Sequence, residues 1–466
     1  MKRSFHISSF SLLASLALVF TTVLSGPVLA GNDGGGALDL TPFTRVAEFD
    51  QILDPVVADQ VAKEVATAIA THVAMVDDTL PPNEFPANWI VGGLEGEPTP
   101  EAIEEAILRI PTPFKINPDE AMSAQNRKKV NVIEMCNPLF AKKALGVLPV
   151  IDGDDTTKII NGYIHAPALP CEVAIYADED GRVNIEMLNP EAIFTLFFTD
   201  VLFGEQMDDA DFAAAIQELP ATVNGEIKTI IYDALDAAGY LYWQVSEPLG
   251  PHYRSLKQVA EVVEETPFES PFAHFIYTKR DGSDFTTDDM NNIAASIINT
   301  LSLDGVHHPS LDAKLNMDDW RSARHAPLPI PGNLVIEACS PTNAITAMGL
   351  GMEHATALPC EIAIKALNSD GVDGNEVLMI SYLDPHFMFS ALFNDAFDDL
   401  SDDELEQLLD LPPLVLEDLQ TIVKDALRPK ELDFKLTRPD QVFFDMLPAD
   451  DDDDDDDDDH KKRKNK

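Results

Sequence analysis

A seven-residue segment occurs twice in this chain, and this repetition limits the possible folds more than any other feature. His165-Ala-Pro-Ala-Leu-Pro-Cys171 is repeated as His354-Ala-Thr-Ala-Leu-Pro-Cys360, with six of the seven positions identical. Each copy then continues into Glu-Val-Ala-Ile or Glu-Ile-Ala-Ile. Self-similarity of this kind is the signature of repeated structural units. We therefore expect a tandem repeat in which each copy has kept its His and Cys.

The similarity extends to both sides of that segment. Upstream, residues 133–138 correspond to residues 336–341, and downstream Asn189-Pro190 corresponds to Asp384-Pro385. The landmarks predict the following organisation: a signal peptide at 1–30, a disordered leader at 31–39, a first repeat domain at 40–238 (motif core 131–200), a second repeat domain at 239–437 (motif core 333–395) and a disordered tail at 449–466.

The N-terminus has the features of a secretory signal. Lys2 and Arg3 precede an apolar run over 10–23, and Val28 and Ala30 are the small residues of a cleavage site, so we expect cleavage after Ala30. No later stretch is long and apolar enough to span a bilayer. We expect a periplasmic or secreted protein with no transmembrane segment after signal cleavage.

The charge of the chain is strongly acidic. Its 81 Asp and Glu residues against 32 Lys and Arg give a formal charge of −49, and the run Asp450–Asp459 precedes a short basic end. Such a field repels nucleic acid and attracts cations or basic partners. An acidic surface is also typical of proteins kept soluble in salt. Like charges in a row prevent collapse, so the tail is expected to be disordered.

Local patterns predict alternating helices and strands. Asn137-Pro138 and Ser340-Pro341 each combine an N-cap residue with Pro at the first helical position. Residues 171–188 alternate around Asp180-Gly181, as in a hairpin. The predicted fold class is therefore α+β, with two tandem two-layer α/β-sandwich-type domains and extra flanking helices.

Each copy is expected to open with a helix followed by a short strand. We expect the helix at 56–73 to correspond to one at 256–263, and the strand at 89–91 to one at 275–277. A further helix is expected to start near Thr99-Pro100 in the first copy and near Thr287 in the second.

The four cysteines are the candidate chemical groups. Cys136 and Cys339 precede helix N-termini, which would lower the pKa of a thiol. An exported chain also permits the pairs Cys136–Cys171 and Cys339–Cys360. Four interpretations stay open: a structural disulfide in each copy, buried free cysteines, a redox-active pair, and a metal or haem-type site.

The metal or ligand interpretation includes both histidines, which could equally be ordinary loop residues. Its candidates are His165, Cys136, Cys171, His354, Cys339 and Cys360, with the acidic neighbours Glu134, Glu172, Glu337 and Glu361. Cys and His are ligands that zinc and copper accept, but no short Cys-x₂-Cys or His-x₃-His spacing accompanies them. The sequence does not identify a cofactor.

The motif set resembles the domain of unknown function 302 family. The resemblance covers about 135–200 and 275–395 and falls on Cys136, Asn137, Pro138, Leu169, Pro170 and Cys171, and on Cys339, Pro341, Leu358, Pro359 and Cys360. Ser340 replaces the family's Asn in the second copy, and both copies have long extra helices. The resemblance implies a compact two-layer α+β domain that tends to dimerise, as a homodimer or by pairing of the two repeats. It implies no established activity.

The functional expectation is correspondingly broad. No phosphate-binding Gly-rich loop, nucleophile elbow or metalloprotease motif is present in the sequence. We expect no catalytic residues and a non-enzymatic binding or stress-related protein whose cysteines are structural or hold a ligand. The alternative is a periplasmic thiol-redox or metal- and haem-handling protein that uses the repeated Cys/His motif.

Overall fold

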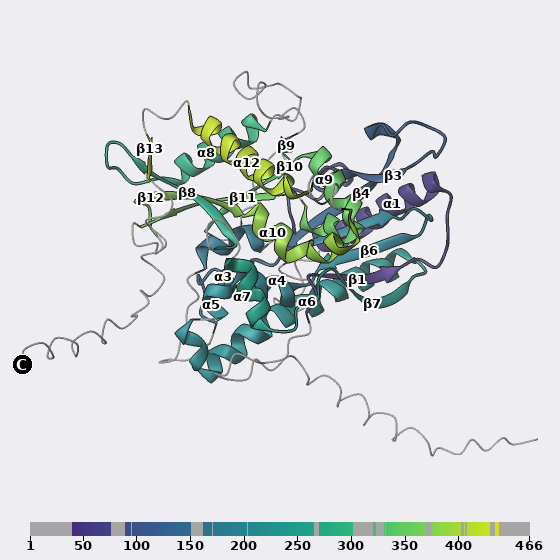
Figure 1. Cartoon of the computed structure of the whole chain (residues 1–466), viewed down its shortest axis with the longest axis horizontal. Coiled ribbons are helices and arrows are strands. Elements are labelled where there is room, and N and C mark those ends of the chain that lie inside the picture. Colours follow the sequence, from purple (N-terminus) through teal and green to yellow (C-terminus); the bar gives the residue numbers. More distant parts are fainter. Residues whose placement is uncertain are drawn as a thin grey trace, which may run out of the picture.

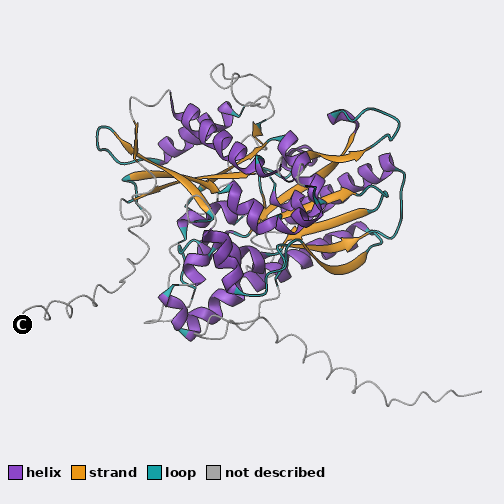
Figure 2. Cartoon of the chain, in the orientation of Figure 1, coloured by secondary structure: helices purple, strands orange, loops and turns teal. Residues whose placement is uncertain are grey.

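The protein has an α+β fold with two antiparallel sheets, each covered by helices on one face (Figures 1 and 2). The computed structural model describes residues 40–75, 89–94, 96–150, 162–169, 171–202, 204–264, 270–301, 320–322, 330, 332–358, 360–368, 374–401, 405, 408–428 and 434–437. The predicted signal peptide, leader and charged tail lie outside these residues, as do Pro170 and Pro359. Among the described helices, none is long and apolar enough to cross a membrane.

The first sheet has the strand order β2-β4-β5-β6-β1-β7, and β3 also pairs with β4. Its strands are β1 (Phe43–Glu48), β2 (Ile90–Val91), β3 (Leu108–Lys115), β4 (Arg127–Cys136), β5 (Cys171–Ala177), β6 (Val183–Leu188) and β7 (Trp243–Leu249). Successive side chains alternate between the faces. On β4, Ile133 and Met135 therefore enter the core under the helices, whereas Val132 and Cys136 face the second half of the chain.

The first half has six described helices, and those starting at Pro55, Pro100 and Pro138 begin at or beside the residues that the sequence predicts. They are α1 (Pro55–Ala74), α2 (Pro100–Ala106), α3 (Pro138–Ala144), α4 (Pro190–Phe197), α5 (Thr199–Leu202) and α6 (Ala210–Ala238), with the 3-10 turns η1 (Ala124–Asn126), η2 (Tyr163–Ala168) and η3 (Glu205–Asp208). Asn137 and Asn189 each cap a helix through the side-chain oxygen, and Pro occupies the first turn. Helices α1 and α6 pack on each other and cover one face of the sheet.

The second sheet has the order β13-β8-β12-β11-β10-β9. Its strands are β8 (Phe272–Lys279), β9 (Arg321–Ser322), β10 (Leu334–Cys339), β11 (Cys360–Leu367), β12 (Val377–Leu383) and β13 (Phe434–Thr437). The helices are α7 (Leu256–Glu264), α8 (Thr287–Thr300), α9 (Pro341–Leu350), α10 (Pro385–Leu392) and α12 (Leu411–Leu427), with the 3-10 turns η5 (Met352–Ala357) and η6 (Asn394–Asp399). Figure 1 shows α8 and α12 together on one face of this sheet.

The two sheets follow the same strand order, but some elements correspond differently from the prediction. Strand β8 pairs with β12 as β1 pairs with β6, and β9 lies beside Cys339 as β2 lies beside Cys136. The expected match between 89–91 and 275–277 is therefore wrong. Similarly, α8 packs on α12 as α1 packs on α6, so α7 is not the counterpart of α1. The short apolar stretches contain no sequence pattern that identifies which neighbouring strand each of them pairs with.

Strand β7 belongs to the first sheet although it follows residue 238, where the sequence suggested a boundary. It pairs antiparallel with β1, as β13 pairs with β8 in the second sheet. The predicted hairpin is present between β5 and β6. Gly181 turns there with φ of +91°, and its Cα hydrogen faces the carbonyl of Leu53, where a Cβ would collide.

The two halves pack against each other reciprocally. Turn η2 of the first half contacts β11 and β12, and turn η5 of the second half contacts β5 and β6. Phe197 on α4 and Phe387 on α10 belong to one apolar cluster that draws on both halves. Tyr253 also donates a hydrogen bond of 2.7 Å to the carbonyl of Ala391 on α10. The faces of the sheets that lack helices are thus covered by the opposite half.

Candidate functional site: two pockets that each contain a cysteine pair

The first pocket lies between α3, α4, α6 and the ends of β4 and β5. It encloses about 630 Å³ of empty space, part of it open to solvent, and both Cys136 and Cys171 line it. Its other walls are mainly aliphatic and aromatic, and Asn137 is one of the few polar contributors. Apolar walls with few polar groups are typical of small-molecule sites.

The second pocket occupies the corresponding place in the other half. It encloses about 490 Å³, part of it open to solvent, and Cys339 and Cys360 line it. Its walls match those of the first pocket almost position by position. The matched pairs include Trp89 and Trp320, Cys136 and Cys339, Cys171 and Cys360, Phe194 and Phe389, Phe198 and Phe393, and Val223 and Val415.

The repeated motif explains how the pocket is built. Cys136 ends β4, and the Asn137-Pro138 cap then turns the chain sharply into α3, which forms one wall. Cys171 begins β5, directly beside β4, with Met135 as its partner in the register. Two phenylalanines, Phe194 on α4 and Phe198 at its C-terminal end, form another wall, and their rings stack with 4.0 Å between the centroids. The motif therefore places two cysteines at adjacent strand ends that line one apolar space.

In each pocket, a tryptophan side chain is hydrogen-bonded to the last long helix of its half, α6 or α12. The indole nitrogen of Trp89 donates to Glu226 Oε2 on α6 at 2.7 Å, and that of Trp320 donates to Asp418 Oδ2 on α12 at 2.6 Å. Burial raises the pKa of both carboxyl groups, that of Asp418 to about 6. The sequence analysis missed Trp320, and the only available signal was that the chain has just three Trp residues.

None of the four cysteines forms a disulfide bond, so the expected pairs Cys136–Cys171 and Cys339–Cys360 are not present in this structure. Burial raises the pKa of Cys171 and of Cys360 to about 12, and it raises the pKa of Cys136 further. The predicted lowering of the Cys136 pKa by the helix N-terminus is therefore wrong. Loss of hydration outweighs the helix dipole because the dipole is worth only about 0.3–1 kcal/mol at an exposed site.

The two histidines lie outside the cysteine pockets, in the contact between the halves. His165 on η2 stacks on Phe198 at 4.0 Å and meets Phe272 of the other half edge-on at 5.3 Å. His354 on η5 stacks on Phe393 at 3.8 Å and meets Phe43 at 5.6 Å. The same contact is thus made twice, once in each direction.

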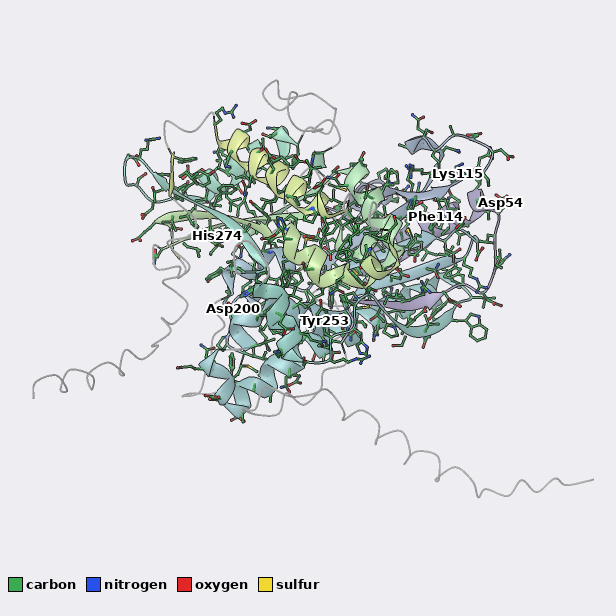
Figure 3. The ribbon with its side chains drawn as sticks, in the orientation of Figure 1. Asp54, Phe114, Lys115, Asp200, Tyr253 and His274 are labelled. Atoms are coloured by element: carbon green, nitrogen blue, oxygen red, sulfur yellow. The ribbon has the colours of Figure 1, made fainter. Side chains whose placement is uncertain are left out.

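The polar contacts of the histidines differ between the halves. His165 Nε2 lies 2.9 Å from Asp200 Oδ1, and its Nδ1 lies 3.1 Å from the carbonyl oxygen of Gly162. Figure 3 labels Asp200 among the helices below the second sheet. His354 Nδ1 lies 3.0 Å from the carbonyl oxygen of Ala347, and burial lowers its pKa to about 4. Within the described ranges, no group of three or more His, Cys, Asp or Glu is placed to hold a metal ion.

The four glutamates flanking the cysteines are buried between the two sheets. Glu134 and Glu172 are register partners on β4 and β5, and Glu337 and Glu361 are register partners on β10 and β11. All four are at most 4% exposed. A hydrogen bond joins the carboxyl groups of Glu172 and Glu361 across the two halves, and burial, followed by the charge of Glu361, raises the pKa of Glu172 well above its usual range.

Glu172 and Glu361 line a third, central pocket between the halves. It encloses about 330 Å³ of empty space, part of it open to solvent. Equivalent residues face each other across it, including Ala168 and Ala357, and Leu188 and Leu383.

Comparison with protein families gives one match. Residues 315–411 match the family described as "Domain of unknown function DUF302". The matched region includes Cys339 and Cys360, and hence both thiols of the second pocket. No curated protein matches the chain significantly, and no solved structure does so.

Proposed function

We propose that this chain is an exported, non-enzymatic binding protein that holds an apolar small molecule in each of two tandem copies of the DUF302 domain. The observation that carries this proposal is that an apolar pocket lined by two cysteines recurs in equivalent places of both halves. Each pocket draws part of its walls from the repeated sequence motif. A repeated cavity of this kind supports binding better than it supports catalysis, because burial raises the pKa of Cys171 and Cys360 to about 12 and so disfavours their reactive thiolate forms.

The tandem arrangement is supported by more than the family match over 315–411. The shared strand order supports assigning the first half to a second copy of the same domain. The reciprocal packing of η2 and η5 on the opposite sheets is what an isologous pair of domains would produce within one chain.

Export and partners are proposed from the sequence. The charged start, apolar run and small-residue cleavage site support release into the periplasm or the exterior. The formal charge of −49 supports basic or cationic partners and disfavours nucleic acid. A stress-related role fits the same properties.

Dye binding tests the two-pocket proposal. The neutral apolar dye Nile red should bind with a stoichiometry of two per chain and quench the fluorescence of Trp89 and Trp320. Ala144→Leu should remove one site by filling the first pocket, and Ala347→Leu should remove the other, because the two alanines line equivalent walls. Ala221→Leu, at an exposed position on α6, is the matched control. Unchanged stoichiometry in both pocket variants would reject the proposal.

A thiol-redox or metal-handling role is the second candidate. It is favoured by one observation, namely that both cysteines of each half line the same pocket. It requires the thiols to react or to bind metal stoichiometrically. Mass spectrometry of the protein from its native compartment, before and after alkylation without reductant, would reveal a bound metal or an oxidised pair.

A further inference from the structure

The first pocket continues towards the interface between the halves. Three residues, Ala168, Leu188 and Ile193, line both the first pocket and the central pocket. The second pocket shares only Met388 with the central pocket. These small or aliphatic side chains therefore form the wall between the two pockets, and an elongated ligand in the first pocket would reach the central pocket by displacing them.

The far end of that path is polar. Glu172 and Glu361 enter the central pocket from β5 and β11, and they are 3% and 4% exposed. The hydrogen bond between their carboxyl groups requires a proton on one of them. Their register partners, Glu134 and Glu337, lie on the neighbouring strands and do not line this pocket.

The carboxyl groups in the central pocket favour one charge on the end of the ligand that reaches them, here called its head group. An anionic head would face a group of carboxyls and lose its hydration without compensation. An ammonium head could donate hydrogen bonds to both carboxylates once the shared proton is released to solvent, and charge-assisted hydrogen bonds of this type are about twice as strong as neutral ones. The low dielectric of the site strengthens the attraction further.

We propose that the first pocket binds a linear alkyl amine, with its tail between Cys136 and Cys171 and its ammonium group between Glu172 and Glu361. This inference rests on the proposed function, since it names the ligand class of the same pocket. It assigns to the two repeated glutamates a role in recognising the head group. It also distinguishes the first pocket from the second, which is expected to take a purely apolar guest.

Displacement of Nile red by decylamine, decanol and decanoate, all below their micelle concentrations, tests the inference. Decylamine should bind the wild-type protein at least about tenfold more tightly than decanol, as expected for a charge-assisted contact, and decanoate should bind most weakly. Glu172→Gln and Glu361→Gln should each reduce the preference for the amine to about threefold or less. Decanol should bind these variants as it binds the wild type, which also shows that they are folded.

The matched control is Glu134→Gln, because Glu134 lies beside Glu172 on the sheet but does not line the central pocket. It should keep the full preference for decylamine. Equal affinity of the amine and the alcohol in the wild-type protein would overturn the inference, as would a preference that survives in both Glu172→Gln and Glu361→Gln. The latter result would mean that the acidic surface attracts the amine. In both cases displaceable Nile red would leave the proposed function standing, whereas a lack of dye binding would reject the function itself.

Discussion

The ring of Phe197 on α4 lies edge-on against the ring of Phe387 on α10, with 5.0 Å between the centroids. Neither side chain is more than 2% exposed, and the contact joins the two halves of the chain. The halves therefore share a core, and each one stabilises the other.

Phe387→Ala should destabilise the whole protein. Removing a buried phenylalanine leaves a cavity and costs about 3–5 kcal/mol, and the loss should affect both halves because Phe387 contacts both. Urea unfolding followed by Trp fluorescence and by far-UV circular dichroism would measure it. Leu414→Ala, at an exposed position of α12, is the control and should change stability little. A variant that loses stability in only one half would contradict a shared core.

Glu186→Gln should reduce the dependence of stability on pH. Burial raises the pKa of Glu186 to about 7 despite its contacts with Arg45 at 2.9 Å and Tyr176 at 2.8 Å. Because the folded pKa lies above the unfolded value of 4.5, the contribution of Glu186 is fully present below pH 4.5 and is lost as the pH rises to about 7. The loss amounts to about 3 kcal/mol.

The measurement is the free energy of unfolding in urea at pH 5 and pH 8. Wild-type protein should lose more stability between the two pH values than Glu186→Gln does. Other buried acids, including Glu172 and Asp418, should leave a residual decrease in the variant, because burial raises their pKa values too. Equal decreases in the two proteins would show that Glu186 does not titrate in this range.

Trp320→Phe should cost more stability than Trp89→Phe. Both changes remove an indole hydrogen bond, but Asp418 is 3% exposed whereas Glu226 is half-buried and can turn to water. A buried acceptor left without its donor costs about 1–3 kcal/mol, so Trp89→Phe should cost about 1 kcal/mol or less. Urea unfolding would compare them, with Trp243→Phe at an exposed position as the control. Equal losses in the two pocket variants would argue against this difference in burial.

The four thiols should resist alkylation in the folded protein. Iodoacetamide reacts with the thiolate, and thiolates of Cys171 and Cys360 form only near pH 12. Intact-mass measurement at pH 8 should therefore find almost no label on the native protein and four labels after unfolding without reductant. Rapid native labelling would mean that the pockets open, and failure to label the unfolded chain would mean that the cysteines are paired.

The local part of the fold could be predicted from the sequence. The caps at Asn137 and Ser340 and the hairpin turn at Gly181 depend on neighbouring residues, which the sequence places side by side. Strand partners were harder to predict, since nothing local indicates that Phe275 occupies the position equivalent to β1 in the second sheet.

In the candidate site, too, the local features could be predicted and the contributions of distant segments could not. The repeated motif brought Cys136 and Cys171 to one place, but it gave no indication of Trp89 and Trp320, which come from segments far from the motif. The predicted direction of the Cys136 pKa shift was also wrong. The start of a helix can be recognised in a sequence, but the burial that raises this pKa cannot. His165 recurs because of its contact with the opposite half.

Because η2 and η5 each pack on the sheet of the opposite half, the evolution of one half constrains that of the other. The C-terminal end of the η2 segment lines the pocket of its own half, whereas the rest of the segment packs on the sheet of the other half. A substitution there can therefore alter the packing of both halves. Either half alone would expose the face of its sheet that the other half covers, including the glutamates buried there, and it would need a second molecule to cover that face. Carrying both halves in one chain makes that partner permanent, and it couples changes in the supports of one pocket to those of the other.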